Sequence, residues 1–310
     1  MKKRIFIACM LFCGVVAAFG QVTDVENTLK VASTDTVSGW KFGTVVGINF
    51  SQTELVNWAA GGQSSLAFNG IFSAYANYLK DKNSWENTLD IGYGLLRQGK
   101  EDDAQWMKTD DKIDFSSKYG RQAFSKFYYA ALINFKTQFT AGYNYPNKID
   151  VISNFFAPAY LTGALGLSYQ PVPYFSAFLA PATGRMTIVN DLTLSESFGL
   201  DAGKTTRTEF GGYVRVNFSK NDFKTEWLKN VAFTTKLDLF SNYLKDPQNI
   251  DVSWETLIAF KVNKYISINL NTHLLYDADI KMQKADGTGL EEKAKVQFKE
   301  ILGIGFSCKF

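Results

Sequence analysis

Apolar and polar residues alternate along most of the chain. The pattern is clearest in the last fifteen residues, 296–310, which read VQFKEILGIGFSCKF. Even positions such as Phe298 and Leu302 are apolar, whereas odd positions such as Gln297 and Lys299 are polar or small. Because successive side chains of a strand point to opposite faces, this period of two predicts a β-strand with one apolar and one polar face.

The same alternation predicts twelve strands, an even number. The links after even-numbered strands are mostly short and those after odd-numbered strands mostly longer, as in outer-membrane barrels. Several predicted strands exceed the about 9–11 residues that cross a bilayer obliquely, which favours a membrane barrel over a soluble β-sandwich or lipocalin-like barrel. We therefore predict an all-β fold, a twelve-stranded antiparallel transmembrane outer-membrane β-barrel. The predicted strands span residues 40–50, 64–79, 84–97, 108–119, 124–143, 160–169, 173–181, 205–219, 228–243, 249–262, 265–278 and 296–310.

The N-terminal sequence MKKRIFIACMLFCGVVAAFG has the features of a cleaved secretory signal peptide. Basic residues precede an apolar run, which ends at a small-x-small cleavage site. Lipidation at Cys13 is the less favoured alternative, because the bulky Phe12 precedes it. Export through this signal predicts localisation in the outer membrane. The predicted parts of the chain are the signal peptide at 1–20, a periplasmic lead-in at 21–38 and the transmembrane β-barrel domain at 39–310.

Charge and cysteine content narrow the classes of function. The chain holds 33 basic and 30 acidic residues, and the signal peptide accounts for three of the basic ones, so the mature chain is balanced. This balance gives no electrostatic reason to expect nucleic-acid binding. Cys308 is the only cysteine outside the signal peptide, and His273 is the only histidine. We therefore expect no intrachain disulfide, no zinc site and no cofactor.

The last six residues resemble the C-terminal signal that the barrel-assembly machinery recognises in outer-membrane proteins. That signal ends in an aromatic residue, here Phe310, with an apolar residue two positions earlier and a glycine five positions earlier. Cys308 and Gly305 occupy those two positions, and cysteine serves as a small hydrophobe. The resemblance implies that the assembly machinery is a partner during insertion.

A second resemblance covers nearly the whole mature chain. Its most specific element is the NW-x-x-GG sequence formed by Asn57, Trp58, Gly61 and Gly62. The chain resembles a Bacteroidota outer-membrane family catalogued as domain of unknown function 3078. This resemblance implies a barrel fold and an outer-membrane location, and it supplies no catalytic residues. The weaker elements that accompany it are Ser153-Asn154-Phe155, Pro158 and Ser241-Asn242-Tyr243.

A search for catalytic residues centres on His273. Barrel hydrolases place a serine where a histidine can activate it, but Leu275 follows two residues later and Ser267 lies too far along the strand. A serine from another strand remains open, and Asp277 and Asp279 are only loosely spaced from the histidine. The acidic pairs at 102–103 and 110–111 lack a calcium-binding spacing and are interpreted as solvated loop charges.

The polar strand faces predict a charged barrel interior. In a narrow barrel such charges can pair across the lumen and fill it, which we favour over a selective pore with one sign of charge at a constriction. The predicted lumen polar network consists of Arg207, Glu209, Arg215, Lys236, Asp238, Glu255 and His273.

These features favour a non-enzymatic binding or accessory subunit of an envelope complex. The alternative is a small-solute channel or transporter, and an outer-membrane hydrolase that uses His273 is less favoured. The expected partners are outer-membrane lipid, the barrel-assembly machinery and an envelope protein, without nucleic acid.

Overall fold

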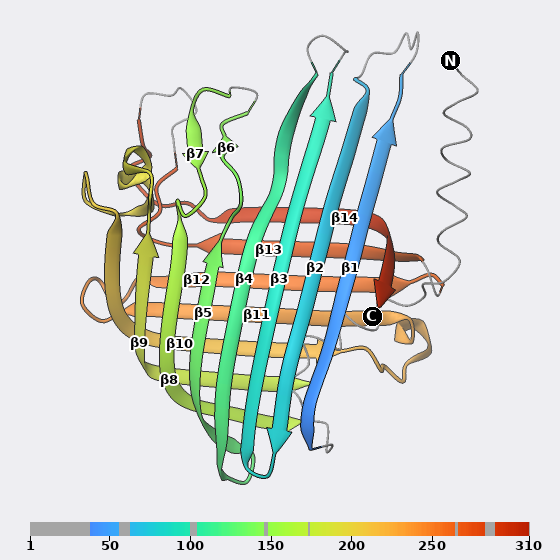
Figure 1. Ribbon diagram of the computed structural model, residues 1–310, viewed down its shortest axis with the longest axis vertical. Coiled ribbons are helices and arrows are strands. Elements are labelled where there is room, and N and C mark those ends of the chain that lie inside the picture. The colour runs from blue at the N-terminus through green and yellow to red at the C-terminus, as the bar shows by residue number, and fades with distance from the viewer. Residues whose placement is uncertain are drawn as a thin grey trace.

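The computed structural model describes residues 38–55, 63–99, 104–145, 148–172, 174–263, 266–282 and 289–309 (Figure 1). The predicted signal peptide and nearly all of the lead-in lie outside these ranges. So do Phe310 and the four family-motif residues Asn57, Trp58, Gly61 and Gly62.

Twelve antiparallel strands of the described chain form a closed barrel, which confirms the predicted fold and strand number. Each strand pairs with the next barrel strand in sequence, and β1 pairs with β14 to close the ring. That seam runs from the Val45–Lys309 pair to the Asn49–Gly305 pair. The barrel strands are β1 (Gly39–Thr53), β2 (Ser65–Lys80), β3 (Asn83–Gln98), β4 (Gln105–Phe124), β5 (Phe127–Thr137), β8 (Ala159–Val172), β9 (Phe175–Ile188), β10 (Thr206–Lys220), β11 (Val231–Asn242), β12 (Ile250–Lys261), β13 (Ile266–Tyr276) and β14 (Gln297–Lys309).

The structure corrects three predicted strands, of which the one at 108–119 extends at both ends to β4, Gln105–Phe124. The predicted strand at 124–143 leaves the barrel wall at Thr137, and β6 (Gly142–Tyr143) pairs instead with β7 (Val151–Ser153) in a small separate sheet. The Asp111 carboxylate accepts hydrogen bonds from the backbone amides of Phe139 and Thr140 at 2.8 and 2.9 Å, which draws the chain out of the ladder. The strand predicted at 173–181 continues to residue 188.

The outside of the barrel is apolar. Phe42 is 69% exposed and Leu302 is 68% exposed, although both lie in regular strands. Trp40 packs against Tyr78 and Trp85 near one end of the barrel, with ring centroids 5.2 and 5.6 Å apart. Such exposure of large apolar side chains all around a barrel is the surface that a lipid environment requires.

A second aromatic row lies toward the other end, where Phe50 packs against Phe68 with a centroid distance of 5.2 Å and Phe68 against Trp106 at 6.1 Å. Ten residues separate Trp40 from Phe50 on β1, which corresponds to about 33 Å along the strand and about 25 Å along the axis of a barrel with ordinary tilt. The two rows are therefore spaced like the interfacial girdles of a membrane barrel.

The links differ between the two ends. Links 81–82, 125–126, 173–174, 221–230 and 262–265 lie at the end where β1 begins and β14 finishes, and the links at the opposite end are mostly longer. The longer links carry the short 3₁₀ helices η2 (Leu192–Leu194) and η3 (Glu196–Phe198), and η4 (Glu226–Leu228) lies at the short-link end. Within the described ranges, no helix is long and apolar enough to cross a membrane.

Part of the interior is a packed apolar core. In Figure 1, β1–β5 form the front wall, and β11–β14 cross behind them. Gly166 on β8 permits close approach to β9, since a Cβ at this position would lie 2.0 Å from the Leu179 carbonyl oxygen. The interior apolar cluster consists of Ala130, Leu132, Ala164, Phe178, Ala180, Tyr213 and Phe240.

Candidate functional site in the barrel interior

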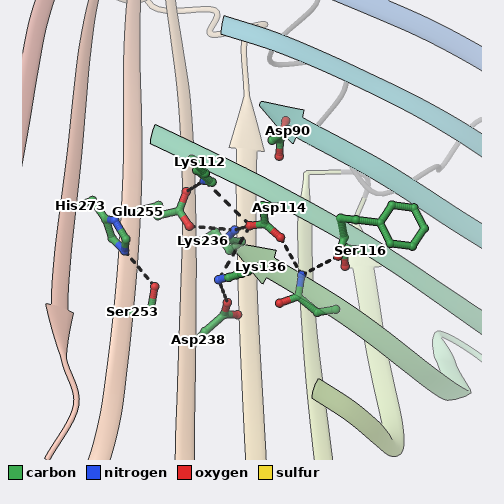
Figure 2. Close-up of polar contacts among 12 residues, drawn as sticks. Asp90, Lys112, Asp114, Ser116, Lys136, Lys236, Asp238, Ser253, Glu255 and His273 are labelled. Atoms are coloured by element: carbon green, nitrogen blue, oxygen red, sulfur yellow. Dashed lines mark hydrogen bonds and ion pairs between the residues drawn. The ribbon is translucent and has the colours of Figure 1, made fainter. Parts of the chain in front are cut away.

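Charged side chains form a layer across the middle of the barrel (Figure 2). They come from β4, β5, β10, β11 and β12, and they point inward because each occupies a polar position of its alternating strand. The layer brings together four of the seven residues predicted as the lumen polar network. We define the central layer as Lys112, Asp114, Lys136, Arg215, Lys236, Asp238 and Glu255.

Ion pairs of the central layer connect opposite walls. The Lys112 Nζ atom on β4 lies 2.8 Å from Glu255 Oε2 on β12, and these two strands are half the ring apart. Lys236 on β11 bridges the same two walls, at 3.0 Å from Glu255 and 3.3 Å from Asp114. The layer therefore crosses the lumen instead of following its wall.

Other contacts saturate the aspartates of this layer. Arg215 donates to both carboxylate oxygens of Asp238, at 2.6 and 2.9 Å, and the Tyr213 hydroxyl donates to the same carboxylate at 2.8 Å. Asn134 donates to Asp114 Oδ1 at 2.7 Å. Lys136 lies 3.6 Å from Asp238 and 3.8 Å from Asp114, beyond hydrogen-bond length. Its ammonium is held by charge alone.

A second charged group, the outer cluster, lies at the long-link end. Arg185 on β9 is its centre, with Glu209 at 2.8 Å, Asp251 at 2.6 Å and Asp277 at 3.8 Å. Its guanidinium also lies over the Phe240 ring, 4.2 Å from the centroid. We define the outer cluster as Arg185, Arg207, Glu209, Asp251, Asp277 and Asp279.

The two groups divide the predicted lumen network. Arg207 and Glu209 are 3.2 Å apart and belong to the outer cluster, so they do not join Arg215 and Lys236 in one network. The outer cluster contains two arginines and four carboxylates, whereas the central layer contains four cations and three carboxylates. Burial raises the pKa of the Asp277 carboxyl, which follows the end of β13, above its ordinary value. The interior thus carries opposite charge excesses at two depths.

A cavity of about 250 Å³ separates the central layer from the outer cluster. Lys136 and Asp238 form part of its floor, and Arg185, Asp251 and Asp277 line its outer part. A second cavity, of about 220 Å³, is lined by residues of β2, β3 and β4 together with central-layer residues. The lumen is consequently divided into compartments in the described structure.

His273 has a serine partner on the neighbouring strand. Its Nε2 atom lies 3.0 Å from Ser253 Oγ on β12, and Ser253 is diagonal to His273 in the β12–β13 register. The residues near His273 in the sequence, Leu275 and Ser267, do not provide this partner, and Ser253 is the serine from another strand that the sequence left as an alternative. A serine–histidine contact is the first requirement of a nucleophilic hydrolase. However, in the described part of the chain no carboxylate lies within hydrogen-bonding distance of the other ring nitrogen.

Several interior residues were missed by sequence reasoning. Asp110 and Asp111 belong to β4, so their interpretation as solvated loop charges is wrong. Asp110 pairs with Lys299 at 2.6 Å, and Asp111 pairs with Lys108 at 2.9 Å. Arg185 was missed because the segment 182–204 was predicted as a loop. Among the described residues, no cluster of three or more histidine, cysteine, aspartate or glutamate side chains is arranged to hold a metal ion.

The predicted assembly-signal residues Gly305 and Cys308 lie on β14, where they pair with Asn49 and Val46 of β1. They therefore form part of the strand seam that closes the ring. The remaining residue of that predicted signal, Phe310, lies outside the described residues.

A closed antiparallel barrel with an apolar outside and a charged inside defines the class of membrane β-barrels. Residues 50–143, which include the NW-x-x-GG element, match the family described as "Protein of unknown function (DUF3078)". This match confirms the family resemblance predicted from the sequence. No curated protein matches the chain.

Three solved membrane proteins are similar in fold. An outer membrane channel from Pseudomonas putida F1 is 9% identical, with 89% of this chain and 97% of that chain covered and a TM-score of 0.39. The CymD monoaromatic hydrocarbon channel is 9% identical, with 88% and 89% covered and a TM-score of 0.32. The ferric yersiniabactin uptake receptor FyuA from Yersinia pestis is 12% identical, with 90% and 52% covered and a TM-score of 0.29. At these identities and TM-scores the matches carry no argument about this chain.

Proposed function

We propose that this protein is an outer-membrane β-barrel that acts as a non-enzymatic binding or accessory subunit of an envelope complex. The apolar outside and the two aromatic rows support the location. The N-terminal sequence supports export, and outer-membrane lipid and the barrel-assembly machinery are the partners that such a location requires.

The cross-barrel ion pair between Lys112 and Glu255 is the observation that carries the proposed role. Together with the interior apolar cluster, it occupies space that an open water channel would need. A barrel with an obstructed lumen presents its long links to other molecules, and loops on a rigid scaffold are the usual carriers of binding.

The partner is tested by chemical crosslinking in native membranes followed by affinity purification and mass spectrometry. We expect one envelope protein to be recovered in a constant ratio with the barrel. A protein that has had the 189–205 link replaced by a short glycine-serine link serves as the matched variant, and we expect it to lose the partner. Recovery of the bare monomer from both strains would refute the accessory role.

A small-solute channel is the second candidate, and the two interior cavities favour it. In this case the central layer acts as a constriction, and planar-bilayer recordings of the wild-type protein should show discrete conductance steps. The double variant Lys112→Met/Glu255→Gln removes the cross-barrel pair and should enlarge those steps. Conductance steps of the same size in the wild-type protein and in this variant would place the ion path elsewhere, and a silent wild-type barrel would exclude the channel.

A hydrolase is less favoured, although Ser253 contacts His273. Its test is the His273→Ala variant, assayed on phospholipid and peptide substrates beside the wild-type protein. Loss of a wild-type activity in this variant, with unchanged folding, would establish the hydrolase and contradict the non-enzymatic role.

A further inference from the structure

We propose that the cavity between the central layer and the outer cluster binds a zwitterion of dipeptide length, with its amino group toward Asp251 and Asp277 and its carboxylate toward Lys136. The site lies in the lumen and does not depend on the envelope partner proposed above. Each of the two ideas can therefore fail without the other.

The floor of the cavity offers an ammonium group that lacks direct hydrogen bonds. Lys136 carries three N–H donors, and its two nearest carboxylates lie at 3.6 and 3.8 Å. Those carboxylates already accept shorter bonds, from Arg215 to Asp238 and from Asn134 to Asp114. A ligand carboxylate at the floor would therefore accept hydrogen bonds that Lys136 does not donate to Asp114 or Asp238.

The outer part of the cavity has the opposite character. Asp251 and Asp277 line it together with Arg185, which also serves Glu209. Arg207 also pairs with Glu209 and Asp279, so two guanidinium groups face four carboxylates at this point. Buried carboxylates in excess of their cations are stabilised by an added ammonium group, which supplies the missing positive charge.

The strand register shows how far apart in depth the floor and the outer part of the cavity lie on the barrel wall. Asp238 pairs with Ser253, and Asp251 pairs with Phe240, so Asp251 lies two residues farther along the wall than Asp238. Two residues correspond to about 7 Å between the backbone positions of Asp238 and Asp251, which is also about the reach of two extended peptide residues. This offset in depth favours a dipeptide over a single amino acid. The aromatic side chains of Tyr160 and Phe240 also line the cavity and provide apolar surface for a ligand side chain.

The test uses isothermal titration calorimetry on the detergent-purified, folded barrel with four small molecules. These are alanyl-leucine, its N-acetyl form, its C-terminal amide and free alanine. We expect alanyl-leucine to bind and each of the other three to bind at least tenfold more weakly, because each lacks one charge or the required length. Equal affinities for the free and the blocked dipeptides, or no heat of binding for alanyl-leucine, would overturn the proposal.

Variants assign the two ends of the ligand. Lys136→Met should weaken alanyl-leucine binding at least tenfold and leave the weak binding of the amide unchanged. Asp277→Asn should also weaken alanyl-leucine binding at least tenfold, but it should leave the weak binding of the N-acetyl form unchanged. Lys118→Met is the matched control, since Lys118 pairs with Glu86 at 2.8 Å in the other cavity. If Lys118→Met weakens binding as much as Lys136→Met does, the proposed site is wrong. If Lys136→Met fails to fold, the comparison of free and blocked dipeptides on the wild-type protein still tests whether both charged ends of the ligand are recognised.

Discussion

The central layer should lose much of its stabilising effect when one carboxylate is neutralised. Asp114 is the sharpest choice, because its carboxylate faces Lys236 at 3.3 Å, Lys136 at 3.8 Å and Lys112 at 3.9 Å. Asp114 is only 3% exposed, so bulk water does not compensate for the loss of these contacts. In the Asp114→Asn variant the amide oxygen can still accept from Asn134. The change therefore removes the charge, and it also turns an amide N–H2 group toward the three ammonium groups, which adds to the loss.

The magnitude follows from the burial of the group. Removal of one partner from a buried ion pair costs about 3–5 kcal/mol, because the opposite charge is left uncompensated. Lys236 retains a second partner in Glu255 at 3.0 Å, so we expect the lower end, a loss of about 3 kcal/mol in the free energy of unfolding. Urea unfolding in phospholipid vesicles, followed by tryptophan fluorescence, measures this difference.

Two further variants check the reasoning. Asp114→Asn/Lys236→Met removes a cation together with the carboxylate, and it should recover most of the lost stability because replacing both members of a buried pair is often nearly neutral. Asp222→Asn is the control, since Asp222 is largely exposed and pairs with Lys220 in a short-link segment. A surface pair of this kind contributes about 0–1 kcal/mol. A loss below about 1 kcal/mol for Asp114→Asn, or no recovery in the double variant, would refute the role of the layer.

Three other predictions concern the core, the outer cluster and assembly. Leu132→Ala should lower the free energy of unfolding by about 3 kcal/mol in the same urea assay, because this side chain is 2% exposed within the interior apolar cluster; Leu244→Ala, in the exposed link between β11 and β12, is its control. Burial raises the pKa of Asp277 in the folded protein, so the fold binds a proton more tightly there than the unfolded chain does. The contribution of Asp277 to stability is full below its ordinary pKa of 3.8 and is lost as the pH rises through the raised value, and a pH series should show a flatter profile for Asp277→Asn. Deletion of Phe310 should reduce the amount of protein in the outer membrane, as measured by immunoblotting of membrane fractions, and an unchanged amount would contradict the assembly-signal assignment.

The barrel fold could be predicted from the sequence because apolar and polar residues alternate along each strand, on its lipid-facing and interior faces. The same rule failed beyond Thr137, where Phe139 and Tyr143 continue the alternation although the chain has left the wall. Conversely, Ala182 and Gly184 interrupt the row of large apolar residues in β9 before Met186 and Ile188, so residues 182–188 were predicted as loop. Alternation reports which residues would suit a sheet, whereas the end of a strand is also decided by partners such as Asp111.

The candidate site was harder to predict, because its contacts depend on which strands face each other across the lumen. The pattern placed Lys236 and Glu255 on inward faces, but it contained no information that Lys112 reaches Glu255 from the opposite wall. Ser253 escaped detection for the same reason, since it meets His273 only through the pairing of two strands. Arg185 was lost together with the end of its strand. The sequence predicted which charged side chains face the interior, but it did not predict which of them contact each other.

The ion pair between Lys112 and Glu255 also bears on how the barrel comes together, because 143 residues separate its two members along the chain. Contacts of such long sequence separation cannot form in a single hairpin or in a flat, growing sheet. The cross-barrel pairs of the central layer therefore contribute only once the walls face each other, whereas the Arg215–Asp238 and Lys236–Glu255 pairs join neighbouring strands and can form earlier. The cross-barrel ion pairs thus favour the closed ring over incompletely closed forms.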